Sequence, residues 1–228
     1  MSAAAAPEAT PFAGIDPDAF AFYAELRDHN DKAWWLAQKQ RYDARVRGPA
    51  EALAGELEAE FGPVKIFRPY RDVRFSADKT PYKDHLGMVT TPADGFAHYL
   101  QLGADGLLTG GGVYQPQTDQ LARFRGIVDD VREFGDLEAT LEELAEHGFA
   151  PFEDDALATA PRGFTADHPR IHLLRLKNLA VGRREAPAAW MSGPDALDAI
   201  RERWRAVSVW CDWLRENVGP SEKHGRSR

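Results

Sequence analysis

The chain has 228 residues, of which 43% are hydrophobic and 28% are charged, and this balance excludes a chain that is disordered throughout. Its 28 basic and 36 acidic side chains give a formal net charge of −8, which argues against non-specific coating of DNA. Cys211 is the single cysteine, so an intrachain disulfide and a zinc site built from cysteines are both excluded.

The two ends of the chain differ in composition from the part between them. The N-terminal stretch is alanine-rich and has neither the basic residues nor the apolar run of a signal peptide, and no apolar run reaches the roughly 18 residues of a membrane span. We therefore expect a disordered leader over residues 1–13, a single domain over residues 14–219 and a disordered tail over residues 220–228. The composition predicts a cytoplasmic protein without a membrane partner.

Three helices are expected at the start of the folded part. Asp16 followed by Pro17 is a typical helix start, because Asp accepts hydrogen bonds from free N–H groups and Pro fits the first turn. The expected boundaries lie at Asp16–Pro17, Asn30–Asp31, Gly48–Pro49 and Gly62–Pro63. Trp34 and Trp35 are adjacent and point to different sides of the second helix, so we expect one in the core and the other over a cleft or at an interface.

A β-like pattern follows these helices. Short apolar runs predict strands at residues 64–67, 73–75, 86–91, 96–102 and 107–108. The run Gly110–Gly112 is expected to end the last strand, either as a turn that needs positive φ or as a flexible backbone that approaches a phosphate. The sequence has no GxxxxGK[ST], so this glycine run is not a P-loop.

The last part of the chain returns to helical spacing. Helices are expected from Pro116 to about residue 131, over residues 137–147, briefly over 169–176, and from Pro194 onward, with a returning strand over 179–183. The irregular stretch over 149–165 is predicted to be an ordered functional loop or lid. Apolar residues three and four positions apart form a stripe on the last helix, which packs on the core or binds a partner chain. These residues are Leu197, Ile200, Trp204, Val207, Trp210 and Leu214.

The order of these elements indicates the fold class. Helices come first, then a block of strands joined by hairpin turns, and then helices again. This order predicts an α+β fold with an antiparallel or mixed sheet flanked by N-terminal and C-terminal helices.

The segment from Phe67 to Lys83 is the densest in charged and aromatic side chains. Its cations are Arg68, Arg71, Arg74, Lys79 and Lys83. Arginine binds phosphate or carboxylate with two parallel hydrogen bonds and lysine acts as a point charge, so the segment suits a small anion. The alternative is an internal salt-bridge network in which Asp72 and Asp78 pair with the cations.

The string RDVRFSADKTPYK resembles the signature of the domain-of-unknown-function 2461 family of conserved hypothetical proteins. Three further strings resemble its other segments: FYAELRDHNDKAWWLAQKQRYD, GGGVYQPQTDQLARFR and PRGFTADHPRIHLLRLKNL. The resemblance covers about residues 16 to 215 and implies a common fold. It implies no activity.

The cationic segments that carry this resemblance select the candidate site. Our hypothesis is that they converge on one cleft lined by arginine, lysine and tyrosine. The candidate ligand-binding residues are Arg71, Arg74, Ser76, Lys79, Lys83, Tyr114, Arg125, Arg162 and Arg170. The candidate proton-transfer residues are His168, Asp72 and Tyr82, with Asp167 orienting the histidine.

A metal site is not expected. His168 and His172 share a face only on a helix, and Pro169 makes His168 or Asp167 a helix cap instead. No serine lies in a GxSxG sequence, and Cys211, in an apolar helix, is expected to be an inert core thiol.

Three functions fit these observations. The first is an enzyme or binding protein for a small anionic ligand, a class that includes phosphorylated compounds. The second is a structural or protein-interaction module whose arginine motifs only stabilise the fold. The third is single-stranded nucleic-acid binding, against which the net charge argues. The sequence leaves the ligand, the cofactor, the reaction and the oligomeric state open.

Overall fold

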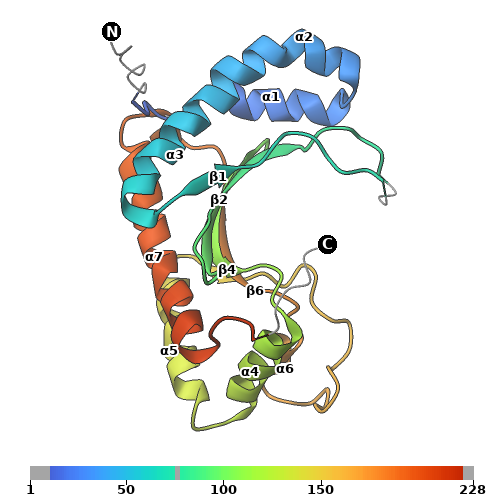
Figure 1. Cartoon of the computed structure of the whole chain (residues 1–228), viewed down its shortest axis with the longest axis vertical. Helices are drawn as coiled ribbons and strands as arrows, with labels where there is room; N and C mark the ends of the chain where they lie inside the picture. Colours follow the sequence, from blue (N-terminus) through green and yellow to red (C-terminus); the bar gives the residue numbers. More distant parts are fainter. Residues whose placement is uncertain (1–10, 75–77, 223–228) are drawn as a thin grey trace, which may run out of the picture. The chain divides into compact units, whose positions relative to one another are not determined.

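The structure is a computed structural model that describes residues 11–74 and 78–222 (Figure 1). The helices are α1 (Pro17–Asp28), α2 (Lys32–Tyr42), α3 (Gly48–Phe61), α4 (Thr118–Asp129), α5 (Phe134–Glu146), α6 (Ile171–Leu174) and α7 (Ala196–Asn217), with a π-helical turn η1 (Asp43–Arg47) and a 3-10 turn η2 (Ala189–Ser192). The strands are β1 (Val64–Ile66), β2 (His85–Thr90), β3 (Ala97–Gly103), β4 (Gly106–Val113), β5 (Ala150–Pro151) and β6 (Leu179–Glu185). These six strands form one antiparallel sheet in the order β1-β2-β3-β4-β6-β5, which confirms the predicted α+β class.

Three predicted features of the secondary structure are wrong: a helix end, a short strand and a strand end. The second helix does not end at Gly48, because η1 carries the helical chain without a break into α3. Residues 73–74 are not in a strand, and Phe75 lies outside the described residues. The run Gly110–Gly112 lies inside β4 rather than at its end, since β4 continues to Val113.

The chain divides into two compact units. The first contains the chain up to Met88, Gln101–Leu107 and Glu185–Ile200. The second contains Val89–Leu100, Leu108–Arg184 and the chain from Arg201 onward. The expected division into leader, single domain and tail stays a prediction.

Side chains near both ends of the described chain make contacts. Phe12 is buried, at 9% exposure, although the leader was expected to reach residue 13. The Ser221 hydroxyl donates to an Asp119 carboxylate oxygen 2.9 Å away, and Ser221 falls within the expected tail.

The core of the first unit is built around an aromatic cluster between its helices. Asp16 and Asp31 cap α1 and α2, as predicted, by accepting hydrogen bonds from backbone N–H groups of the first turns. The two helices run side by side (Figure 1) and enclose Phe22, which contacts Trp35 with ring centroids 5.8 Å apart. Trp35 is 2% exposed, whereas its neighbour Trp34 is partly exposed, so one tryptophan of the pair is in the core as expected.

The core of the second unit is built around α7. The stripe residues Trp204, Val207, Trp210 and Leu214 are buried, which confirms the core-packing interpretation. Each indole N–H on this helix also has an acceptor: Trp204 donates to the Tyr99 carbonyl, Trp210 to the Leu179 carbonyl and Trp213 to the Asp136 carboxylate. The indoles therefore bury their area without leaving a polar group unpaired.

Thr109 on β4 allows the free-energy cost of an unpaired buried hydroxyl in the second unit to be measured. Its side chain is fully buried, and its hydroxyl has no hydrogen-bond partner among the described residues. Because an unpaired buried hydroxyl costs free energy, Thr109→Val is expected to raise the free energy of unfolding by about 1–2 kcal/mol. Urea denaturation measures this change.

Thr140 on α5 provides the matched control. Its side chain is also buried, but its hydroxyl donates to the Asp136 carbonyl at 2.9 Å. Thr140→Val should therefore lower the free energy of unfolding by about 1 kcal/mol. Equal effects of the two substitutions would contradict the assignment of an unpaired hydroxyl to Thr109.

Candidate functional site

The candidate segment of the first unit is held by a short antiparallel bridge between Tyr70 and Tyr82. The Arg71 N–H donates to the Pro81 carbonyl at 2.9 Å, and the Lys83 N–H donates to the Pro69 carbonyl at 2.8 Å. Residues 71–74 and 78–81, between the two sides of this bridge, are in neither a helix nor a strand, and residues 75–77 lie outside the described residues.

Asn30 pairs with the far side of this bridge. Its side-chain amide donates to the Tyr82 carbonyl at 2.9 Å and accepts from the Tyr82 N–H at 3.1 Å. A single amide thus satisfies both backbone groups of Tyr82, as a neighbouring strand would. Asn30 therefore positions Tyr82, and with it the next residue, Lys83.

Three predicted ligand-binding cations of this segment have partners within the segment. Arg71 donates to the Asp78 carboxylate and, at 2.7 Å, to the Thr80 hydroxyl. Arg74 donates to both carboxylate oxygens of Asp72, at 2.9 and 2.6 Å, and the Lys79 ammonium donates to the Val73 carbonyl at 2.9 Å. These contacts are the internal network that the sequence offered as an alternative to anion binding, and the side chains of Arg74 and Asp72 are well exposed.

The predicted proton-transfer residues Asp72 and Tyr82 lie in contrasting surroundings. Hydrogen bonds from the Arg74 guanidinium hold the pKa of Asp72 at about 2, so this carboxylate is ionised at neutral pH. Tyr82 is 4% exposed, its ring is stacked on Trp35 at 4.1 Å, and burial raises its pKa. Both residues are thereby anchored, and their roles in proton transfer stay predictions. Ser76 lies outside the described residues.

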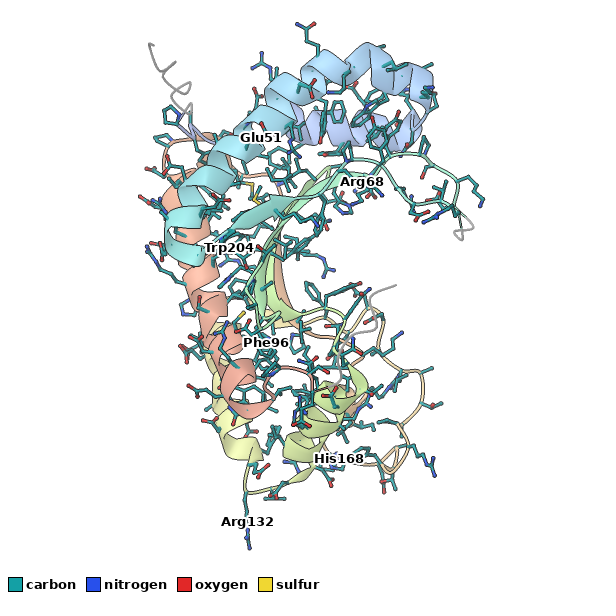
Figure 2. The ribbon with its side chains drawn as sticks, in the orientation of Figure 1. Glu51, Arg68, Phe96, Arg132, His168 and Trp204 are labelled. Carbon is teal, nitrogen blue, oxygen red and sulfur yellow. The ribbon has the colours of Figure 1, made fainter. Side chains whose placement is uncertain are left out.

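A second group of cations in this unit has no such partners. The Lys83 ammonium lies 5.0 Å and the Lys65 ammonium 5.9 Å from the centre of the Phe67 ring. Arg68 follows Phe67 directly and is labelled in Figure 2. We call Lys65, Phe67, Arg68 and Lys83 the Phe67 cluster. Within residues 11–74 and 78–222, no ion pair joins any of its three cations to a carboxylate.

Electrostatics single out Lys83 within the Phe67 cluster. Its side chain is partly buried, and this burial, together with the nearby Arg68 guanidinium, lowers the pKa of Lys83. Both causes disfavour the charged ammonium. Several other cations of the unit have carboxylate partners instead, namely Arg27, Lys39, Arg41, Arg45, Arg47, Arg71 and Arg74. The Phe67 cluster is thus a local excess of positive charge in an acidic chain.

The predicted binding residues of the second unit are engaged or exposed. Arg125 donates to the Leu174 carbonyl at 2.9 Å and the Leu176 carbonyl at 3.1 Å, and burial lowers its pKa. Arg170 lies over the Phe134 ring, with its guanidinium carbon 4.3 Å from the ring centre. Two further candidates, Tyr114 and Arg162, are exposed.

These residues and those of the Phe67–Lys83 segment belong to different units. Their convergence on one cleft stays a prediction.

His168 connects two elements of the second unit. Its Nδ1 accepts a hydrogen bond from the Arg170 N–H at 3.1 Å, and its Nε2 lies 3.2 Å from a carboxylate oxygen of Asp129 at the end of α4. The side chain is 15% exposed (Figure 2 labels it). Both ring nitrogens are therefore engaged in holding the turn before α6, and a catalytic role for His168 stays a prediction.

The other features singled out in the sequence have structural surroundings. A side chain on Gly111 would collide with Val207, and one on Gly112 with the Leu179 carbonyl, so packing accounts for these glycines. Burial raises the pKa of Cys211 to about 12, which keeps the thiol protonated, as expected for a core cysteine.

The described part of the chain contains neither a cluster of metal-ligating side chains nor a helix suited to span a membrane. No group of three or more His, Cys, Asp or Glu side chains there is arranged to hold a metal ion. No helix there combines the length and the apolar composition needed to cross a bilayer.

Sequence reasoning missed two contributors to this site. Asn30 was assigned only to a helix boundary, because nothing local marks its pairing with a residue 52 positions away. Lys65 was assigned only to a strand, although alternation along the expected strand over 64–67 puts residues 65 and 67 on one face and gave a usable signal.

Comparison with known proteins identifies the family of this chain, and it identifies no ligand or activity. Searches of curated proteins and of solved structures return no match. Residues 18–213, most of the chain, match the family described as conserved hypothetical protein (DUF2461). The protein belongs to this family, as its sequence motifs indicated.

Proposed function

We propose that the protein binds a small anionic ligand, through a phosphate or carboxylate group, at the Phe67 cluster. The observation that carries this proposal is Lys83, a partly buried cation beside a second cation, with no carboxylate partner among the described residues. A cation in such surroundings is held at a cost in free energy unless an anion neutralises it. An anion bound between Lys83 and Arg68 would lower this cost.

The remaining cations of the segment shape the site in this proposal. Arg71 and Arg74 hold the loop through Asp78 and Asp72, and Lys79 holds it through a backbone carbonyl. Lys83 and Arg68 then provide the direct contacts, with the point charge of the ammonium and the paired donors of the guanidinium.

Phosphate and sulfate are expected to raise the melting temperature of the purified protein. An anion at 100 times its dissociation constant adds about 2.7 kcal/mol of stability, which for a chain of this length corresponds to a shift of roughly 5–10 °C. Lys83→Met should remove this shift. It should not lower the melting temperature of the ligand-free protein, because it removes a disfavoured charge and keeps an apolar contact with Phe67.

The control is Lys39→Met, which makes the same change in charge at a lysine that pairs with Asp43. This variant should keep the full anion-induced shift. The proposal is wrong if neither anion shifts the wild-type melting temperature, or if Lys83→Met and Lys39→Met respond to the anions alike.

A structural function is the second candidate, and one observation favours it. The guanidinium groups of Arg71, Arg74, Arg125 and Arg170 all have hydrogen-bond acceptors within the protein. On this interpretation the arginine motifs fix loop geometry and bind no ligand. A ligand-free protein that loses stability in each arginine variant and shows no anion effect would support it.

A further inference from the structure

Lys83 differs in exposure from the other lysines of the described chain. Residues 11–74 and 78–222 contain six lysines, of which Lys83 is partly buried and the other five are exposed. Those five are Lys32, Lys39, Lys65, Lys79 and Lys177. The nitrogen of Lys83 lies 5.0 Å from the centre of the Phe67 ring. This nitrogen therefore has less water around it than that of an exposed lysine.

The backbone at Lys83 is fixed by hydrogen bonds on both sides of the bridge. The Lys83 N–H donates to the Pro69 carbonyl at 2.8 Å, and both backbone groups of the preceding residue, Tyr82, pair with the Asn30 amide. The side chain of Lys83 therefore starts from a defined position. A reactive group that is already positioned loses less freedom when it meets a ligand.

The surroundings of Lys83 favour its neutral form. Burial and the nearby Arg68 guanidinium both lower the pKa of Lys83, and burial has the larger effect. Within residues 11–74 and 78–222, neither cation forms an ion pair with a carboxylate that would offset this effect. The neutral amine is the nucleophilic form of lysine, and desolvation and a neighbouring cation are the two conditions that activate it in proteins.

We propose that Lys83 is a nucleophile that forms a Schiff base with a small oxo acid whose carboxylate is bound by Arg68. This proposal rests on the anion site proposed above and names its ligand class. Because the guanidinium of Arg68 and the amine of Lys83 are neighbours, a ligand whose carboxylate is next to its carbonyl carbon matches both groups.

The covalent step is a condensation. The Lys83 Nζ adds its lone pair to the carbonyl carbon of the ligand, and the carbonyl oxygen becomes a hydroxyl. This oxygen then leaves as water together with the two hydrogens of the amine, and a C=N double bond joins Nζ to the ligand. No oxidant or reductant takes part. Protonation of the imine places a positive charge beside the ligand carboxylate, as the ammonium does with a simple anion.

Trapping with glyoxylate and borohydride tests the nucleophile. Glyoxylate has an aldehyde directly beside its carboxylate, and reduction of the imine leaves a stable carboxymethyl group on the lysine. Peptide mapping by mass spectrometry should find this group on Lys83 before it appears on Lys65, which lies near the same ring but is exposed. Lys83→Arg should abolish the fast labelling, since it keeps the charge and cannot form an imine. Lys39→Met, the control, should leave the labelling of Lys83 unchanged.

Acetaldehyde tests the role of Arg68, because it has the aldehyde without the carboxylate. Arg68→Met should lower the ratio of glyoxylate to acetaldehyde labelling at Lys83 roughly 5- to 10-fold. The ratio is the useful measure, since a change in the pKa of Lys83 affects its reaction with both aldehydes alike. A ratio that Arg68→Met does not change overturns the oxo acid as the ligand class.

The remaining outcomes separate this proposal from the anion site. If Lys83 is labelled no faster than the exposed lysines while phosphate still raises the melting temperature, the nucleophile is wrong and the anion site stands. No preferential labelling together with no phosphate-induced shift overturns both proposals.

Discussion

Replacing Gly112 with alanine is expected to lower the free energy of unfolding by about 4 kcal/mol or more. Gly112 has a φ of +114°, a backbone conformation that residues with a side chain rarely adopt. An added Cβ would also lie 2.2 Å from the Leu179 carbonyl oxygen, which accepts the hydrogen bond of the buried Trp210 indole. The substitution therefore strains β4 and pushes apart a contact in the core of the second unit. Urea denaturation followed by tryptophan fluorescence measures the loss.

Gly126→Ala is the control for this experiment. Gly126 lies on the exposed side of α4, and an added Cβ would meet nothing within 4 Å. Because alanine favours helix more than glycine does, this variant should be more stable than the wild type by about 0.5–1 kcal/mol. A Gly112→Ala protein that is as stable as Gly126→Ala would show that β4 is not constrained by its neighbours as described.

Removing the Arg125 guanidinium is expected to lower the free energy of unfolding by about 2–4 kcal/mol. Arg125→Ala removes two charge-assisted hydrogen bonds, to the carbonyls of Leu174 and Leu176, and leaves both acceptors without this donor. Arg125→Lys should fall between the alanine variant and the wild type, because a single ammonium cannot reproduce the planar fork of two N–H groups. Chemical denaturation of the three proteins gives the order directly.

Arg132 serves as the comparison for this series. Its exposed side chain extends away from α4 and α5 (Figure 2). Arg132→Ala should change the free energy of unfolding by no more than about 0.5 kcal/mol. If Arg125→Ala has an equally small effect, the hydrogen bonds of Arg125 are not important for stability, and a free role in ligand binding becomes the better interpretation of this residue.

The arginine motifs of this family thus combine two physical situations. Arg74 and Arg125 illustrate the first, because their guanidinium groups are bonded to a carboxylate and to backbone carbonyls respectively. Lys83 and Arg68 illustrate the second, because they are close together and neither forms an ion pair with a carboxylate among the described residues. A signature rich in cations is therefore not by itself a binding site. The cations that form no ion pair with a carboxylate are the ones whose charge a bound anion would neutralise.

Local features of the sequence predicted local features of the fold. Asp16 and Asp31 act as helix caps because a cap is a contact between residues two or three positions apart. The stripe on α7 that includes Trp204 and Leu214 is buried because helical periodicity alone brings these residues to one face. The order of helices and strands was in the same way sufficient for the α+β class.

The ends of helices and strands depend on packing, and the sequence predicted them less well. Gly48 and Pro49 suggest a helix end by composition, yet the π-helical turn before them lets the helical chain continue. Gly112 suggests a turn by its conformational freedom, whereas its glycine character allows β4 and β6 to approach closely. In both cases a neighbour distant in sequence or a change of helical geometry outweighs the local preference.

The sequence by itself determined the fold class, the helix caps, the buried face of α7, the family and the segment in which charge gathers. Only the tertiary structure decided which charges in that segment are neutralised. Arg71 has Asp78 as a partner and Lys83 has no carboxylate, although both residues occur in one short cationic string. The reason is physical: ion pairing and desolvation depend on distances across the fold, such as the pairing of Asn30 with Tyr82, and a linear sequence does not contain those distances.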